Sequence, residues 1–193
     1  MNPSPRKLEI ISVASTLFKE KGYSAVTMRD IAKVMGIKAA SLYNHIKNKE
    51  EILTFIIISL AEEFINGLEK IKSGNNDCIY KLKQIIILHV DISSRNTNGM
   101  ASLNNDWMHL KDQLNHYLAL RMEYENSFRN IISEGILKNE IKNINPDIMV
   151  FSILSTLRSL YLWVPKKDDM EPSMFVLNPH FFRVHKLLII LES

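Results

Sequence analysis

Cysteine is almost absent from this chain of 193 residues, in which Cys78 stands alone. A single cysteine excludes an intrachain disulfide and offers no pair of thiols at a metal-binding spacing. His109 and His116 lack the i, i+4 spacing of a helical metal pair, and His180 and His185 lack it too. We therefore predict a protein of the reducing cytoplasm with no metal site and no cofactor.

Glycine and proline are also scarce, at 6 residues each. Long runs of Ile, Leu, Lys and Glu, with few turn-forming residues between them, favour helices over a turn-rich sheet. The longest apolar stretch, residues 52–61, is interrupted by Thr54 and Ser59 and is far shorter than the roughly 20 residues of a membrane helix. The start of the chain has no secretory signal. We expect an all-α, soluble, cytoplasmic protein without membrane contact.

Motifs of catalysis are missing as well. The chain has no Ser, His and Asp in a hydrolase-like order, no Gly-rich phosphate loop and no convincing pair of carboxylates. We predict that the protein is not an enzyme.

Charge is distributed unevenly along the chain. Residues 1–50 contain nine Lys or Arg and four Asp or Glu, a net charge of +5, whereas residues 51–193 contain fifteen and seventeen, a net charge of −2. A basic segment of this kind favours contact with nucleic acid phosphates.

The densest local signals lie between Thr27 and Ile46. Thr27 and Asp30 have the spacing of a helix-capping pair, and Gly36 stands where the short helix must end in a sharp turn. In the second short helix Leu42 and Ile46 are four residues apart and face inward. The residues that remain outward are Lys38, Ala39, Ala40, Ser41, Tyr43, Asn44 and His45. This pattern predicts a helix-turn-helix.

The same stretch resembles the N-terminal signature of TetR-type transcriptional regulators over residues 5 to 55. The matching residues are Thr27, Arg29, Ile31, Ala32, Gly36, Ile37, Leu42, Tyr43, His45 and Lys49. The sequence departs from the family at Lys38, where a serine or threonine is common, so the recognition helix lacks its usual cap. The resemblance implies phosphate contacts for Thr27, Tyr43, His45 and Lys49. We assign base edges to Lys38, Ala39, Ser41 and Asn44, and include Arg29 and Ala40 in the same interface.

Helical periodicity continues on both sides of this motif. An amphipathic helix over 6–21 completes a three-helix DNA-binding domain over residues 4–50, which extends into a long helix over 48–73. Residues 51–193 form a larger helical domain for ligand binding and dimerisation, for a total of about nine helices. Its last helix opens at Asn178 and Pro179 and carries more apolar surface than one side needs, which predicts a homodimer.

The larger domain is similar, over residues 100 to 165, to that of a TetR branch that often responds to fatty acids or acyl-CoA thioesters. The similarity rests on Trp107, Arg121, Tyr124, Glu125, Glu134, Gly135 and Trp163. It implies an all-helical ligand pocket. The candidate ligand-binding residues are His89, Trp107, Tyr117, Arg121 and Tyr124.

Each candidate also has a structural interpretation. His89 on an apolar helix face is typical of a hydrogen-bonded core histidine, and Arg121 and Glu125 are spaced to pair with each other. Trp107 fits a core position as well as a pocket wall. These alternatives remain open at the level of sequence.

Together these features predict a ligand-responsive, dimeric transcriptional repressor. Its partners would be double-stranded DNA, as a palindromic operator, and a small hydrophobic ligand such as a fatty acid or acyl-CoA. A DNA-binding regulator controlled by a protein partner is the first alternative, and a helical enzyme is the second.

Overall fold

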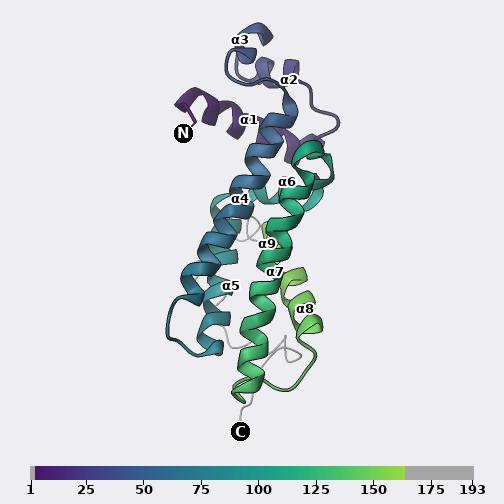
Figure 1. Ribbon diagram of the computed structural model, residues 1–193. Coiled ribbons are helices and arrows are strands. Elements are labelled where there is room, and N and C mark those ends of the chain that lie inside the picture. The colour runs from purple at the N-terminus through teal and green to yellow at the C-terminus, as the bar shows by residue number, and fades with distance from the viewer. Residues whose placement is uncertain (1–2, 164–193) are drawn as a thin grey trace. The chain divides into compact units, whose positions relative to one another are not determined.

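A computed structural model describes residues 3–163, which form helices and no strands (Figure 1). The prediction of an all-α fold is therefore confirmed. The helices are α1 Pro5–Lys21, α2 Met28–Val34, α3 Ala39–Tyr43, α4 Lys49–Lys72, α5 Cys78–Arg95, α6 Thr97–Asn105, α7 Leu114–Leu137, α8 Pro146–Arg158 and α9 Leu160–Trp163, with 3-10 turns at Trp107–His109 and Lys111–Gln113. The helix predicted to open at Asn178 lies outside the described residues.

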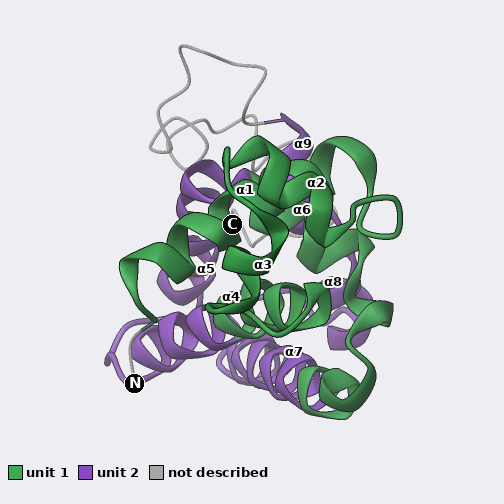
Figure 2. Cartoon of the chain, turned by 90° about the horizontal axis from the view of Figure 1, so that it is seen from above, with its two compact units in different colours: residues 1–61, 98–118 green, residues 62–97, 119–193 purple. Residues whose placement is uncertain are grey.

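The chain divides into two compact units, coloured separately in Figure 2. Unit 1 consists of Met1–Ala61 and Asn98–Leu118, and unit 2 of Glu62–Thr97 and Ala119–Ser193. Helices α4 and α7 each contribute residues to both units. The segment between α6 and α7 thus belongs, by its contacts, with the N-terminal helices.

The helix boundaries follow capping signals that are visible in the sequence. Thr27 and Asp30 form a reciprocal capping box at the start of α2, and Asn145 accepts a hydrogen bond from the Asp147 N–H at the start of α8. Gly36, at φ +66°, makes the turn between α2 and α3 in a backbone conformation that a side chain disfavours. The capping pair of Thr27 and Asp30 and the turn at Gly36 were correctly predicted.

Unit 1 has a core in which α1, α2 and α3 meet the first turns of α4. Its fully buried side chains include Ile10, Phe18, Ile31, Leu42, Ile46 and Ile52. The 98–118 segment is attached by polar and aromatic contacts. The Asn98 amide donates to Thr16 Oγ1 at 2.9 Å, and the Tyr23 and His109 rings lie 5.1 Å apart.

Unit 2 contains a close approach between helices. A Cβ at Gly135 of α7 would lie 2.5 Å from Ile141 Cδ1 and 2.9 Å from Cys78 Cβ, so only glycine fits there. Cys78 is buried at this contact, and burial raises the pKa of its thiol to about 11. The thiol therefore stays protonated and has a packing role.

None of the helices within residues 3–163 is long and apolar enough to cross a membrane.

Candidate functional site

The recognition helix α3 is short and is held by one side chain. Leu42 is 0% exposed and is the only buried residue among its five. Lys38 precedes the helix in an extended conformation and makes no side-chain cap, as its departure from the family pattern implied. Because α3 is anchored on a single face, the opposite face is presented to solvent.

That outer face contains most of the predicted DNA-binding residues. Lys38, Ala40, Ser41, Tyr43, Asn44 and His45 are exposed, and Ala39 is half-buried. The face combines small side chains, which let a helix approach base edges closely, with hydrogen-bonding and basic groups. All of these residues belong to unit 1 and lie in α3 or directly beside it.

Helix α2 supplies Thr27 and Arg29, both exposed. The Thr27 hydroxyl donates to Asp30 Oδ2 at 2.6 Å and accepts from the Asp30 N–H at 3.2 Å. The hydrogen bond from the Thr27 hydroxyl lowers the pKa of Asp30, which therefore remains charged. Thr27 thus caps α2 as predicted, and Arg29 lies in the first turn of this helix.

Lys49 is placed differently from the other predicted contacts. Its ammonium donates to the carbonyls of Tyr23 at 2.6 Å and Val26 at 2.8 Å, and lies 4.2 Å from the centre of the Tyr23 ring. Burial lowers the pKa of Lys49. The side chain holds the connection between α1 and α2, a role that its sequence position alone did not reveal.

In unit 2, one carboxylate joins two arginines. Glu125 Oε1 accepts from Arg121 Nε at 3.1 Å and from Arg158 Nη2 at 2.6 Å, and all three side chains are about one third exposed. Burial raises the pKa of Glu125, but the hydrogen bonds from Arg158 and Arg121 outweigh burial and hold it below its usual range. The predicted Arg121–Glu125 pair is confirmed. Arg158 was missed, although an arginine within the apolar stretch of α8 was a visible signal.

A second cluster in unit 2 centres on His89, which is buried in α5. Its Nε2 lies 2.8 Å from the Tyr124 hydroxyl of α7, and the Phe64 ring of α4 lies 4.5 Å from the imidazole. Burial, with a smaller contribution from the charge of Arg158, lowers the pKa of His89 to about 3, so the imidazole is neutral. Burial also raises the pKa of Tyr124. His89 and Tyr124 are therefore both neutral and hydrogen-bonded to each other, and the apolar ring of Phe64 lies against both.

The five predicted ligand-binding residues fall into two groups. His89, Arg121 and Tyr124 lie in unit 2, whereas Trp107 and Tyr117 lie in unit 1 with their ring centres 6.0 Å apart. Within residues 3–163, no group of His, Cys, Asp or Glu side chains is arranged to hold a metal ion.

The exposed helix-turn-helix and the all-helical fold define a DNA-binding transcriptional regulator. Two family models match the chain. Residues 10–54 match the bacterial regulatory proteins of the tetR family, and residues 76–172 match the tetracyclin repressor-like C-terminal domain. The protein belongs to the TetR family, whose members are transcriptional regulators and not enzymes.

Individual relatives agree with this assignment. The HTH-type transcriptional repressor KstR2 of Rhodococcus jostii is 24% identical over 135 residues, which are 69% of this chain and 66% of the repressor, slightly under two thirds of its length. The structure of the ketosteroid regulator KstR2 of Mycobacterium tuberculosis has a TM-score of 0.86 at 17% identity, covering 95% of this chain and 94% of that one. AibR, in a crystal structure with isovaleryl coenzyme A and operator DNA, has a TM-score of 0.73 at 19% identity, covering 89% and 94%. The two structures share the fold.

The buried neutral histidine predicts a dependence of stability on pH. Below its ordinary pKa of 6.5, His89 binds a proton in the unfolded chain but not in the folded chain until about pH 3. The contribution of His89 to folded stability should therefore be fully present well above pH 6.5. It should be lost progressively as the pH falls below that value. Between pH 7.5 and 5.5 the loss from this residue should be about 1.4 kcal/mol.

Urea unfolding at fixed protein concentration would measure this loss. The comparison is with the His89→Leu/Tyr124→Phe double variant. Besides His89 it removes only Tyr124, whose raised pKa keeps its hydroxyl protonated over this pH range. If wild type and double variant lose the same stability on acidification, His89 is not the buried neutral group inferred from the structure.

Proposed function

We propose that the protein is a dimeric repressor that binds a palindromic operator through α2 and α3 and responds to a small hydrophobic ligand. The observation that carries this proposal is that α3 has one buried face and one exposed face. Leu42 is fully buried, while the polar, small and basic residues beside it are exposed. A helix that is packed on one face and exposed on the other suits insertion into a major groove.

The proposed DNA contacts fall into two groups. Lys38, Ala39, Ser41 and Asn44 face base edges, whereas Thr27, Arg29, Ala40, Tyr43 and His45 surround them and meet the backbone. Because the two recognition helices of a dimer have a fixed separation, the half-sites would lie about 34 to 36 Å apart or a multiple of that distance. Because operator DNA is the proposed partner, we propose that the protein acts in the cytoplasm.

Dimerisation is supported by exposed apolar side chains near the end of the described chain. Phe151 of α8 is 74% exposed, and Ile148, Leu162 and Trp163 are also more than half exposed. Large apolar side chains that are left exposed are typical of a surface that a partner covers. We assign this surface to a second copy of the chain.

Ligand binding is assigned to unit 2. Arg121 and Arg158 both pair with Glu125, which gathers two guanidinium groups at this point of unit 2. The neighbouring rings of Phe64, His89 and Tyr124 contact one another and carry no charge. A fatty acid or acyl-CoA has the matching combination of an apolar chain and an oxygen-rich head group. The complex of AibR with isovaleryl coenzyme A supports this class of ligand.

Replacing Lys38 by alanine tests the assignment of base contacts. Lys38 is exposed at the start of α3, so its loss should change base preference at one operator position by about 1 to 3 kcal/mol without altering the fold. Fluorescence anisotropy with the operator, single-base variants and random DNA would measure the change. Lys83→Ala, an exposed lysine of α5, is the control. Equal losses on operator and random DNA would contradict a base contact by Lys38.

A further inference from the structure

The Lys49 ammonium is hydrogen-bonded within unit 1, which leaves Lys47 as the nearby lysine that can contact the DNA backbone beside α3. Lys47 lies four residues beyond Tyr43, the last residue of α3, and its side chain is exposed. Its ammonium makes no ion pair or hydrogen bond with another of the described residues. By contrast, the Lys49 ammonium is occupied by backbone carbonyls of the α1–α2 connection.

The backbone of Lys47 is fixed by Glu51, although its side chain is exposed. The Lys47 N–H donates to Glu51 Oε2 at 2.7 Å, and the Glu51 N–H donates to Asn48 Oδ1 at 2.8 Å. In the first bond Glu51 accepts, and in the second Glu51 donates, so the two bonds together hold the segment that leads into α4. They restrict the backbone where Lys47 is attached, which lowers the entropy lost when its ammonium contacts a ligand.

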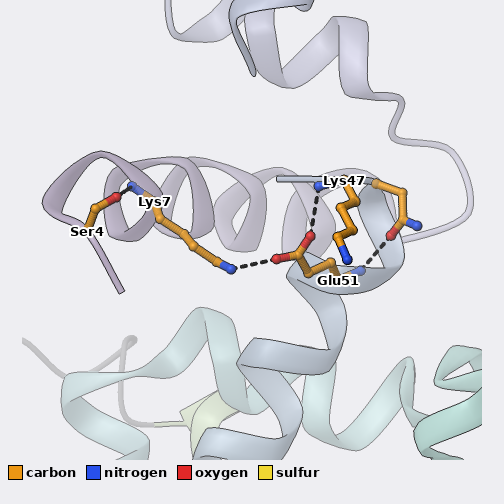
Figure 3. A network of polar contacts seen from close by, with 5 residues as sticks. Ser4, Lys7, Lys47 and Glu51 are labelled. Carbon is orange, nitrogen blue, oxygen red and sulfur yellow. Dashed lines mark hydrogen bonds and ion pairs between the residues drawn. The ribbon is translucent and has the colours of Figure 1, made fainter. Parts of the chain in front are cut away.

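Glu51 is itself held from a distant part of the sequence. Its other oxygen, Oε1, accepts from the Lys7 ammonium of α1 at 2.5 Å, and the Lys7 N–H donates to the capping Ser4 hydroxyl at 3.3 Å (Figure 3). Burial raises the pKa of Glu51, but the hydrogen bonds from Lys7 and Lys47 outweigh burial and keep it ionised. The charges of Lys7 and Lys47 also lower the pKa of Glu51. Lys7 forms the ion pair with Glu51, whereas Lys47 bonds to Glu51 through its backbone N–H.

We propose that Lys47 contacts a DNA phosphate next to the recognition helix, and that Glu51, fixed by Lys7, is the positioning residue for this contact. The inference rests on the proposed DNA binding and adds to it a contact by a residue that is not among those that match the family signature. Lys49 has a structural role in the same unit.

The proposal predicts a change in the salt dependence of binding. Each lost phosphate contact lowers the slope of log affinity against log salt by about 0.9. Lys47→Ala should therefore reduce the slope by about one unit for each bound protomer, on operator and random DNA alike. At 0.15 M salt the affinity should fall about fivefold per protomer, with an unchanged melting temperature.

Glu51→Gln separates positioning from simple charge. Removing a negative charge near DNA by itself strengthens binding, and Glu50→Gln measures that effect, because Glu50 is the adjacent acid and pairs with Lys111 in the same unit. If Glu51 positions Lys47, Glu51→Gln should weaken binding two- to threefold in the wild-type background. It should cause no loss in the Lys47→Ala background, because there is no ammonium left to position.

Anisotropy titrations of the four proteins of this cycle, from 0.05 to 0.3 M salt on one operator duplex, would provide these values. A wild-type salt slope for Lys47→Ala would overturn the phosphate contact. Equal losses from Glu51→Gln in both backgrounds would overturn the positioning role. If wild type itself shows no salt-dependent DNA binding, the proposed function has failed, and that result is distinct from both of the others.

Discussion

Leu42→Ala should reduce operator affinity at least tenfold while leaving most of the helix content intact. Helix α3 has five residues, far fewer than a helix needs to persist by itself in water, so it depends on packing. Leu42 supplies its only buried side chain, and truncating a fully buried leucine costs about 2 to 5 kcal/mol. The loss would fall on the helix that we propose contacts the DNA bases.

Tyr43→Ala is the matched control for this prediction. Tyr43 adjoins Leu42 but is 54% exposed, so its truncation should weaken DNA binding without lowering the melting temperature. Circular dichroism and anisotropy on both variants would separate the two effects. Operator affinity of wild-type strength in Leu42→Ala would show that α3 is not the reading element.

His89→Leu should lower the free energy of unfolding by about 1 to 3 kcal/mol. The substitution leaves the Tyr124 hydroxyl buried without its imidazole partner, and an unsatisfied buried group carries this cost. Adding Tyr124→Phe removes the unsatisfied hydroxyl. Because replacing both partners by apolar groups is nearly neutral, the double variant should recover most of the lost stability.

The same double variant tests whether this pair contacts the ligand. Release of operator DNA by isovaleryl-CoA and by longer acyl-CoAs, measured by anisotropy, should change its ligand preference in the double variant if His89 and Tyr124 line the ligand site. Arg121→Ala should weaken the response to both an acyl-CoA and a free fatty acid. An unchanged response in the double variant would assign His89 and Tyr124 to the core alone.

The sequence predicted most reliably those features that depend on neighbouring residues. Capping by Thr27 and Asp30, the turn at Gly36 and the inward placement of Leu42 all follow from local backbone geometry, and the structure contains each of them. The weakly capped start of α3 at Lys38 was visible for the same reason.

Contacts between distant residues were harder to predict. Periodicity shows that Lys49 begins a helix but not that its ammonium turns back to carbonyls 23 and 26 residues earlier in the chain. The pairing of Arg158 with Glu125 has the same limitation, since it joins residues 33 positions apart. The Arg121–Glu125 pair could be predicted because both residues lie on one helix, four positions apart.

We propose that the exposed face of α3 reads a two-fold symmetric operator as part of a dimer. Hydroxyl-radical footprinting of the full-length protein on DNA selected from a random pool would test it most directly. We expect two protected half-sites related by a two-fold axis, about one helical turn or a multiple of it apart. Lys38→Ala should alter the selected base preference at symmetric positions. A single asymmetric protected site at saturating protein, or selected DNA with no common sequence, would contradict it.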